Sequence, residues 1–431
     1  MSALPTEGDL HGPDHSRPAL AAVFGAPAGP VARRLVASYC FPPYSDTAAI
    51  VAAKRVHDHG EAVDVICNAM DSIRHRDPSL VQLCGGLVRR FAAVPSRTAF
   101  SSWTSISSYA HLGLDTFLRW EAEQGEYESV YSRAQFAASH FLAAQVKTAR
   151  PQISWDAEFS DPLSHDVLGR PREARAEDDR TLARLRESIE AAGFRPPDGL
   201  NSFEWCEALA FALADRIMFT NEHQRDFMLE SCRDPQLATR AERVSVVSPH
   251  PTPAPELYTA RPSEQWLDPD RRHIGYFGNF YANRGVAGVL DALDRLPRAH
   301  RDRVLLHVYT SKPEELREVV ADRGLADCVD VGPFVGYLDF LALARRMDCL
   351  LVNDAVSPPG VQNPFLPSKW SDYRGSGTPV WGVVEEGSAL DGQPLDHRSP
   401  IEHVSAAVQV LMRISSAPAR SGAVASPTPG R

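Results

Sequence analysis

The most informative segment of the chain is Asn363-Pro-Phe-Leu-Pro-Ser-Lys-Trp-Ser-Asp-Tyr-Arg-Gly-Ser-Gly-Thr-Pro-Val-Trp381. Its first part is a loop that ends in Pro367, and a helix is predicted from Ser368 onward. An acidic residue, Asp372, lies five positions before a glycine, and the Gly-x-Pro-Val that follows opens the next strand. A loop, a short helix and a strand in this order belong to an α/β domain.

The start of this helix suits a diphosphate group. A helix N-terminus presents free N–H groups and the positive end of the helix dipole to an anion. One turn further along, the carboxylate of Asp372 can accept hydrogen bonds from both hydroxyls of a ribose, and Lys369 can place a positive charge beside a phosphate. The alternative is that Lys369 and Asp372 form a solvated helix face.

A second segment lies about 90 residues earlier: His273-Ile-Gly-Tyr-Phe-Gly-Asn-Phe-Tyr-Ala-Asn-Arg-Gly285. It is predicted to run from a strand through a glycine-containing loop into a helix. Gly278 lets the backbone approach a ligand closely. Both segments follow strand ends in one α/β domain, so both are expected to face one crevice. An ordinary strand-to-helix turn is the simpler alternative.

Together the two segments resemble the nucleotide-sugar signature of glycosyltransferase family 4 and its GT-B relatives. In that family a basic residue, here Arg284, holds the donor diphosphate. The resemblance implies an α/β protein of the GT-B type, with two Rossmann-like doubly wound domains that face a central cleft. It also implies transfer of a sugar from a nucleotide-diphosphate sugar, with retention and without a metal ion. The implied donor-binding residues are Gly278, Asn279, Arg284, Pro367, Ser368, Lys369 and Asp372.

The rest of the chain repeats the alternation of short apolar runs and helical patterns, which predicts a parallel sheet in each domain. Residues 248–255 contain four prolines in eight positions and predict a semi-rigid linker. Residues 79–92 and 127–147 are predicted to be helical. The expected division is a tail at 1–30, an acceptor-side domain at 31–250, a donor-binding domain at 251–400, a C-terminal helix at 401–415 and a tail at 416–431. The resemblance implies that the C-terminal helix packs back on the first domain.

A loop after the first predicted strand, Phe41-Pro-Pro-Tyr-Ser-Asp-Thr-Ala-Ala-Ile50, is the third candidate segment. Members of the family commonly have a glycine-rich loop here that touches the acceptor and the donor phosphate. Tyr44, Ser45, Asp46 and Thr47 are the corresponding candidates, although Asp46 would repel a phosphate. The alternative is a simple helix N-cap at Ser45 or Asp46.

Candidates for catalysis lie in the first domain. Trp155-Asp-Ala-Glu-Phe-Ser-Asp-Pro162 follows a strand and concentrates three carboxylates. Glu158 occupies roughly the position where the family often has a histidine, and it could act as a base toward an acceptor hydroxyl or hold a sugar. Asp161 and His111 are further candidates. The alternatives are an acidic surface loop for the carboxylates and a structural role for His111.

One departure from the family affects the reaction. The family has two glutamates spaced eight apart; Asp372 matches the later one, but Pro364 stands where the earlier one belongs. Asn363, Gln362 or Asp354 is expected to contact the sugar instead. The alternatives to a transferase are a nucleotide-sugar epimerase on the same fold and a degenerate subunit that binds without turnover.

Composition limits the partners and the location. The formal net charge is -10, which disfavours nucleic acid as a partner. The seven cysteines are scattered, which argues against a disulfide framework or a zinc site and favours reduced thiols. No signal peptide or membrane-spanning run is recognised, so a cytoplasmic location is expected, with the inner face of the membrane as an alternative. No cofactor is expected.

The acceptor is expected to be a glycan, a lipid-linked molecule or a small molecule. A helical pattern at 132–150, with Phe141, Leu142 and Val146, could make peripheral membrane contact.

Overall fold

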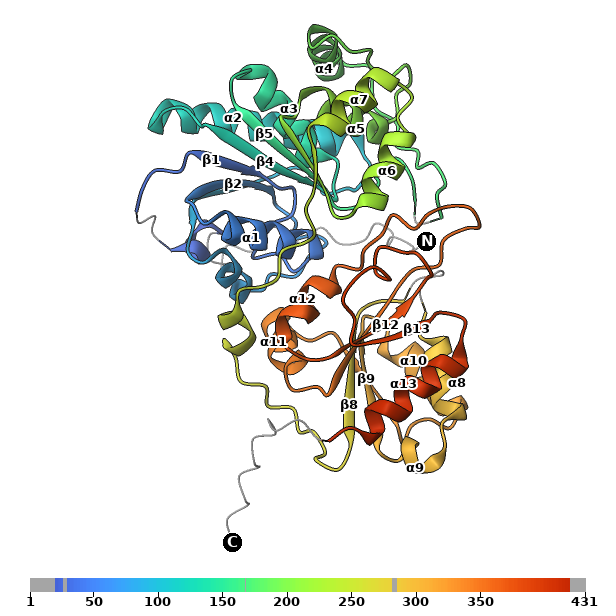
Figure 1. Ribbon diagram of the computed structural model, residues 1–431. Helices are drawn as coiled ribbons and strands as arrows, with labels where there is room; N and C mark the ends of the chain where they lie inside the picture. The colour runs from blue at the N-terminus through green and yellow to red at the C-terminus, as the bar shows by residue number, and fades with distance from the viewer. Residues whose placement is uncertain (1–19, 26–28, 167, 281–284, 419–431) are drawn as a thin grey trace.

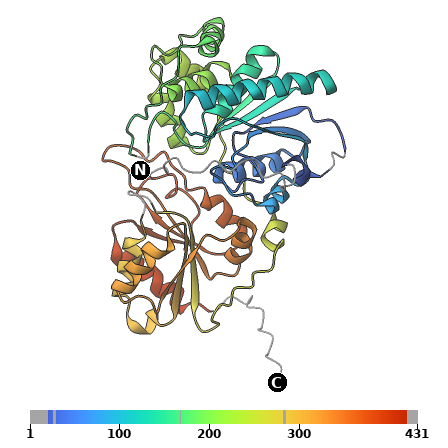
Figure 2. The same cartoon turned by 180° about the vertical axis from the view of Figure 1, so that it is seen from behind.

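The computed structural model describes residues 20–25, 29–166, 168–280 and 285–418. These residues form two α/β domains, one above the other in Figure 1, and each is built on one parallel sheet. The prolines at 249–255 lie between the last strand of the first sheet and the first strand of the second, where the domain boundary was predicted. Seen from behind in Figure 2, the same two bodies meet along one junction.

The first sheet has the strand order β3-β2-β1-β4-β5-β6-β7. Its strands are β1 (Arg34–Ala37), β2 (Val63–Asn68), β3 (Val88–Val94), β4 (Ser129–Ala134), β5 (Ser154–Phe159), β6 (Arg216–Phe219) and β7 (Ser245–Val247). The helices are α1 (Thr47–His59), α2 (Trp103–Gln124), α3 (Ala138–Ala149), α4 (Arg180–Ala191), α5 (Ser202–Leu213), α6 (Glu222–Glu230) and α7 (Pro235–Arg243). Short 3₁₀ helices are η1 (Leu20–Phe24), η2 (Pro78–Cys84) and η3 (Pro255–Thr259).

The second sheet has the order β10-β9-β8-β11-β12-β13. Its strands are β8 (Arg272–Phe277), β9 (Val304–Thr310), β10 (Val329–Pro333), β11 (Cys349–Asn353), β12 (Val380–Val384) and β13 (His397–Pro400). The helices are α8 (Ala287–Arg295), α9 (Arg298–Arg301), α10 (Pro313–Asp322), α11 (Tyr337–Ala344), α12 (Lys369–Ser376) and α13 (Val404–Ser416). The strand order reverses between β8 and β11, and a crevice forms outside the strand ends at such a point.

The central strands are buried on both faces, as their sequences require. Every residue of β2 and of β11 is buried. Strand β11 is the apolar run that parallel sheets use, ending at Asn353, whereas β2 also buries the polar Asp64 and Asn68. Helix α1 begins where the Asp46 side chain accepts a hydrogen bond from the Ala48 N–H, and it ends at Gly60, which is left-handed. The doubly wound architecture that was predicted is therefore present in both domains.

Two strands were predicted as helices. The prediction for 79–92 was wrong because the segment divides into η2 and the edge strand β3. The prediction for 127–147 was wrong at its start, where β4 precedes α3. The sequence of β4 is Ser-Val-Tyr-Ser-Arg-Ala, and Ser132 and Arg133 are buried although they are polar. Buried polar side chains remove the apolar signal on which such predictions depend.

The C-terminal helix corrects another expectation. Helix α13 packs on α8 and β13 of the second domain, not on the first domain (Figure 1). Its apolar stripe, which includes Val410, Leu411 and Ile414, joins the core that contains Leu290 and Trp381. The stripe covers one face of the second sheet, and this burial holds the helix in its own domain.

The linker and the N-terminal segment are more ordered than expected. His250, Leu257 and Tyr258 are buried, so the linker packs along the second domain after it leaves the first. The tail predicted for 1–30 contains η1, whose Phe24 ring lies 4.8 Å from the Phe91 ring. Residues 1–19, 26–28 and 419–431 lie outside the described residues.

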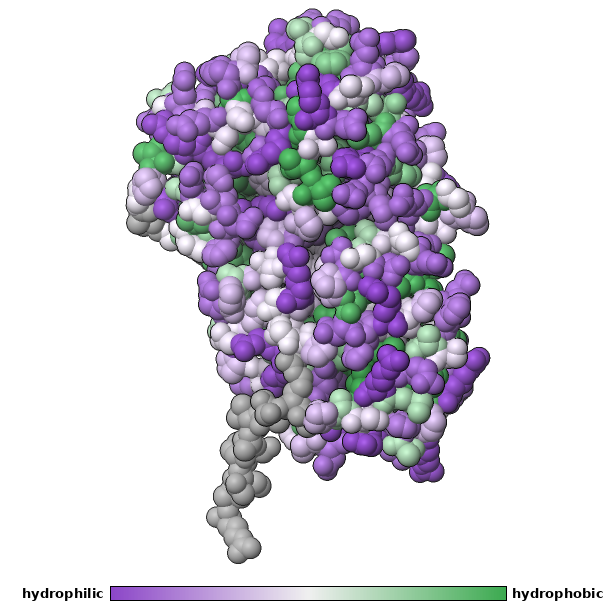
Figure 3. Space-filling model, in the orientation of Figure 1, coloured by the Kyte–Doolittle hydropathy of each residue, from purple (hydrophilic) through white to green (hydrophobic). Residues whose placement is uncertain are grey.

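The apolar side of α3 does not face a membrane. Phe141, Leu142 and Val146 are at most 1% exposed and belong to the core of the first domain, so the expected membrane contact at this helix was wrong. In the part of the chain that the structure describes, no helix is both long enough and apolar enough to span a bilayer. The face of the molecule in Figure 3 is mostly hydrophilic.

Candidate functional site

A crevice of about 450 Å³ lies at the carboxyl ends of the second sheet, beside the point where the strand order reverses. Gly285, at the start of α8, and Asn353, at the end of β11, form part of its wall. Leu168 reaches it from the first domain. Asn353 Nδ2 donates a hydrogen bond of 2.9 Å to the carbonyl oxygen of Gly285, which joins the two strand ends. Gly285 is the one residue of the two predicted segments that lines this crevice among the described residues.

The loop after β8 has two of the predicted donor residues in the described part. The N–H of Gly278 donates to the carbonyl of Tyr309 at 3.0 Å. Asn279 Oδ1 accepts hydrogen bonds from the N–H and the hydroxyl of Ser311, at 3.1 and 2.7 Å. Asn279 therefore holds the loop after β9 in place. Arg284 lies outside the described residues.

Helix α12 begins as predicted, just after Pro367 and Ser368. Ser368 is the N-cap residue, but its side chain makes no capping hydrogen bond. Lys369 lies with its Nζ 4.4 Å from the centre of the Phe340 ring and remains one-third exposed. This contact resembles a cation–π pair and leaves the ammonium free to meet a ligand on its exposed side.

Asp372 is buried at the junction between the domains. Its Oδ1 accepts hydrogen bonds from Lys54 Nζ, on α1 of the first domain, at 2.8 Å and from the Tyr337 hydroxyl at 2.7 Å. Lys369 Nζ lies 3.7 Å from Oδ2. Burial alone would raise the pKa of Asp372, but Lys54 and Lys369 outweigh it, so the pKa lies below its ordinary value. Burial in turn lowers the pKa of Lys54. The carboxylate predicted to hold a ribose is therefore ionised and already paired.

Glu158 is also buried and paired, so the alternative of an acidic surface loop was wrong for this residue. Its carboxylate accepts hydrogen bonds from Arg55 Nε at 2.9 Å and from the Tyr131 hydroxyl at 2.5 Å. Burial would raise its pKa, but Arg55 and Arg133 hold the pKa below the ordinary value. A carboxylate held ionised by two guanidinium groups is a poor proton acceptor.

Arg133 completes this cluster. Its side chain is 1% exposed and Nε lies 3.7 Å from Glu158 Oε1. Within the described residues, its Nε and Nη1 have no hydrogen-bond partner. Nη2 lies 3.2 Å from His250 Nε2, and burial lowers the pKa of His250 well below its usual range, so this ring is neutral and accepts.

The charges at the junction do not balance. Four cations, Lys54, Arg55, Arg133 and Lys369, surround two buried carboxylates, Glu158 and Asp372. We refer to these six side chains as the junction cluster. Arg55 also lies 4.0 Å from Asp58, whose side chain is 66% exposed. The four cations therefore outnumber the three carboxylates by one, and unbalanced charge in a buried site is costly unless an anion binds there.

The other first-domain candidates have local roles. Asp46 is the N-cap of α1 and pairs with Arg74 at 2.7 Å, so the capping alternative is confirmed. Tyr44 is buried and its hydroxyl donates to Asp71 at 3.1 Å. Ser45 and Thr47 are exposed beside them. None of these contacts places Tyr44 or Asp46 against a phosphate.

The remaining candidates are not brought together. Asp161 is half-buried in the loop after β5. His111 lies on the outer side of α2, where its side chain is 71% exposed and its Nε2 is 3.7 Å from Asp115. The surface position and the paired carboxylate favour the structural alternative for His111.

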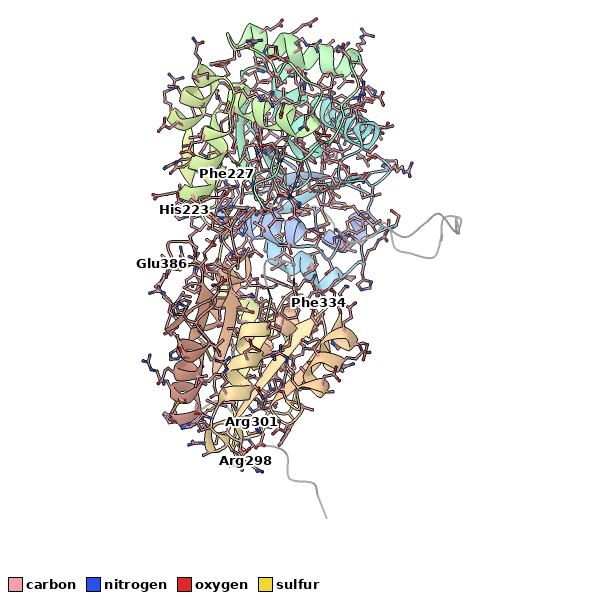
Figure 4. All side chains as sticks on the ribbon, turned by 90° about the vertical axis from the view of Figure 1, so that its right-hand side faces the viewer. His223, Phe227, Arg298, Arg301, Phe334 and Glu386 are labelled. Atoms are coloured by element: carbon pink, nitrogen blue, oxygen red, sulfur yellow. The ribbon has the colours of Figure 1, made fainter. Side chains whose placement is uncertain are left out.

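The loop before α12 also meets the first domain. Asn221 Nδ2 donates to the carbonyl of Pro364 at 3.0 Å, and a ring nitrogen of His223 lies 3.2 Å from the carbonyl of Asn363. The amide of Asn363 donates to Glu385 Oε2 at 2.9 Å. Figure 4 shows His223 above and Glu386 below the junction on the same side of the molecule. The residues around Pro364 thus bridge the domains.

Comparison with known proteins bears on the fold. No family model matches the chain, and no curated protein matches it. Solved structures do. Sucrose-phosphate synthase from Thermosynechococcus elongatus is 13% identical with a TM-score of 0.53, covering 90% of both chains. The chain has the GT-B fold.

Two further structures agree. A glycosyltransferase from Rickettsia africae is 11% identical with a TM-score of 0.54, covering 89% of this chain and 88% of that one. The catalytic domain of starch synthase IV from Arabidopsis thaliana, bound to ADP and acarbose, is 9% identical with a TM-score of 0.54, covering 89% of this chain and 92% of that one. At these identities the likeness concerns the fold.

Sequence reasoning identified Lys369 but missed the other three cations of the junction cluster, Lys54, Arg55 and Arg133. Lys54 and Arg55 are adjacent charges in a helix whose neighbours Ala52, Ala53 and Val56 are apolar and buried. A pair of charges inside an apolar helical stripe was the available signal. Arg133 lies in a strand that was predicted as a helix, so its position could not be assigned from the pattern.

Proposed function

We propose that this protein is a glycosyltransferase that binds a nucleotide-diphosphate sugar between its two domains. The observation that carries the proposal is the positive charge of the junction cluster, whose four cations, all but Lys369 nearly buried, outnumber Glu158, Asp372 and the exposed Asp58. A nucleoside diphosphate supplies the missing negative charge. In this proposal the sugar lies in the crevice beside Gly285 and Asn353, at the carboxyl ends of the second sheet.

In the proposed binding step the domains separate at the junction and admit the donor. Lys54 then exchanges the carboxylate of Asp372 for a phosphate oxygen, and Asp372 is released to accept hydrogen bonds from the ribose hydroxyls. Arg133 has two buried nitrogen atoms without partners in the described part of the chain, and these are suited to a second phosphate oxygen.

In the proposed transfer step the cations stabilise the negative charge that develops on the departing diphosphate. With the positive charge supplied by side chains, the reaction needs no metal ion. Glu158 is held ionised between arginines, so we assign the proton of the acceptor hydroxyl to the leaving phosphate. This front-side displacement retains the configuration of the sugar, and an inverted product would exclude it.

A subunit that binds the nucleotide sugar without transfer is a second candidate. Two observations favour it: Asp372 is already paired, and Pro364, at the position of the family's first glutamate, offers only its carbonyl group, which Asn221 occupies. Release of sugar from the donor in the presence of an acceptor distinguishes the two candidates.

The proposal is tested by the thermal stability of the protein with UDP, GDP, ADP and dTDP, with and without EDTA. Ligand at 100 times its dissociation constant stabilises a protein by about 2.7 kcal/mol, which is a shift of several degrees. We expect one nucleotide to raise the melting temperature equally with and without EDTA, and Asp372→Asn to reduce that shift. No response to any of the four would contradict the proposal.

A further inference from the structure

A second cavity lies away from the junction, within the first domain. It has a volume of about 690 Å³ and lies among α5, the loop at 193–198, the turn between α6 and α7, and Ser164, His165 and Pro171. Pockets for small ligands commonly measure roughly 300–1,000 Å³. Nothing in the proposed donor chemistry uses this cavity, which we call the side cavity.

Apolar groups form much of its wall. Phe211 and Leu237 are buried side chains of α5 and α7, and Ala208 lies one turn before Phe211. Four prolines complete the apolar part: Pro171, Pro196, Pro197 and Pro235. Their rigid rings keep the cavity's shape without the loss of conformational freedom that flexible side chains would suffer on binding.

The polar groups of the side cavity carry a negative excess. Arg195 pairs with Asp198 at 2.7 Å and Arg233 pairs with Glu204 at 3.2 Å. Two further carboxylates have no cationic partner among the lining residues: Asp234, which caps α7, and Glu207. A nucleotide or any other phosphate is repelled here, in contrast to the junction cluster.

Glu207 ties the cavity to the loop that approaches the crevice. Its Oε1 accepts hydrogen bonds from the N–H groups of Leu163 and Ser164 at 3.0 and 2.9 Å, and its Oε2 accepts one from the Ser164 hydroxyl at 2.8 Å. The same loop continues to Leu168, which lines the crevice in the second domain. One loop therefore borders both cavities.

Helix α6 makes a second connection. His165, a lining residue, packs edge-to-face on Phe227, with 5.3 Å between the ring centres. His223 lies one turn earlier on α6, about 6 Å along its axis, and contacts Asn363 of the second domain. Figure 4 shows Phe227 and His223 in succession toward the junction. The side cavity is thus about one helical turn beyond the domain contact.

We propose that the side cavity binds an uncharged saccharide, as the distal part of the acceptor. The proposal rests on the glycosyltransferase function argued above. Paired carboxylates and guanidinium groups around an apolar floor offer both donors and acceptors to hydroxyl groups, while the floor meets the C–H face of a sugar ring. An acceptor of a few sugar units held here extends along α6 toward the donor.

Cys232 gives a direct test. It lines the side cavity and is half-buried, whereas the six other cysteines are buried. Burial raises the pKa of its thiol, so alkylation by iodoacetamide at pH 8.5 is slow enough to follow. Maltotriose, cellotriose and chitotriose are the neutral probes, with spermine and UDP as charged probes, and Cys232→Ser confirms the site of labelling. We expect at least one neutral trisaccharide to slow alkylation fivefold or more.

A glycan array with neutral oligosaccharides extends the search, and two variants locate the binding. Gln236→Trp places a large ring at the exposed rim and should abolish glycan binding while the nucleotide-dependent thermal shift persists. Lys54→Met should do the reverse. Protection by spermine alone, or glycan binding unchanged in Gln236→Trp, would overturn the proposal, as would the absence of any neutral glycan bound. A nucleotide response without glycan binding rejects only this inference, whereas glycan binding without a nucleotide response rejects only the donor site.

Discussion

At the residue scale, the contact between Lys54 and Asp372 decides how the domains meet. Both side chains are at most 5% exposed and come from different domains. A buried ion pair contributes little over an apolar pair, but the loss of one partner leaves a buried charge without compensation. The pair therefore holds the two domains together, and in the proposed function an incoming diphosphate replaces Asp372 as the partner of Lys54.

This account predicts a strongly non-additive double-mutant cycle. Lys54→Met and Asp372→Leu should each lower the free energy of unfolding by about 3–5 kcal/mol, since each removes the nearest opposite charge from a buried partner. The double variant should be more stable than either single one, because neither charge remains. Urea unfolding of the four proteins measures the coupling, and additive losses would show that the pair is not a closed unit.

Glu207 predicts a pH dependence at the side cavity. Burial raises the pKa of Glu207 from 4.5 to about 6, so the folded protein binds a proton that the unfolded chain releases. Stability from this group is therefore greatest below about pH 4.5 and declines as the pH rises to about 6, by about 2 kcal/mol.

Glu207→Gln should remove this component. Between pH 4.5 and pH 7 the variant is expected to lose about 2 kcal/mol less stability than the unmodified protein. Melting temperatures across the window measure the difference, with Glu204→Gln at the rim as the matched control. Parallel profiles for the protein and Glu207→Gln would contradict the assignment.

The candidate site shows what sequence can give at this scale. Asp372 and its helix were predicted from the sequence, because Pro367 precedes the helix and Gly377 follows it. The partners of Asp372 were not found, because Lys54 is more than 300 positions away and belongs to another domain. Glu158 was placed in its strand, but its burial depends on Arg55 and Tyr131, which no local pattern relates to it.

At the element scale, α12 is clamped against the linker. Gly375 faces Tyr258 and Thr252, and a Cβ atom at this position would overlap with both. The Tyr258 hydroxyl donates to the carbonyl of Asp372 at 2.6 Å, so the two elements have no room to separate without losing this bond.

Gly375→Ala should therefore destabilise the protein, by about 1–3 kcal/mol, as overpacking of a well-filled contact does. Gly392→Ala is the control, since a Cβ there meets nothing closer than 3.8 Å. Thermal unfolding compares the two. Equal stability of both variants would show that α12 and the linker are loosely packed.

Elements were predicted well where their surroundings are uniform. The strands β8, β9 and β11 are apolar runs between helices, and their positions follow from the alternation alone. The strands β3 and β4 were missed, because one is at the sheet edge and the other buries Ser132 and Arg133. The predicted packing of α13 on the first domain was wrong. It was taken from the family resemblance, whereas the apolar stripe of α13 packs into the core of the second domain.

At the scale of the whole molecule, two regions differ in the sign of their charge: the contact between the domains and the cavity within the first domain. The junction cluster has surplus positive charge, and the side cavity has surplus negative charge. In the proposed function this separation directs a phosphate to one place and an uncharged sugar to the other. Leu168 lines the crevice, and Ser164, His165 and Pro171 line the side cavity, so one loop connects the two sites that we propose for donor and acceptor.

The most direct test of the account is the affinity of the nucleoside diphosphate identified by the thermal shift, measured by titration calorimetry for the protein, Arg133→Met and Arg298→Met. Arg298 is the matched control, because its side chain is 87% exposed on α9 at the far end of the second domain (Figure 4).

A hydrogen bond to a charged group contributes about 1.5–3 kcal/mol, so Arg133→Met should weaken binding by roughly ten- to hundredfold. Arg298→Met should change it less than twofold. Equal affinities in all three proteins would contradict the claim that the junction cluster is the donor site.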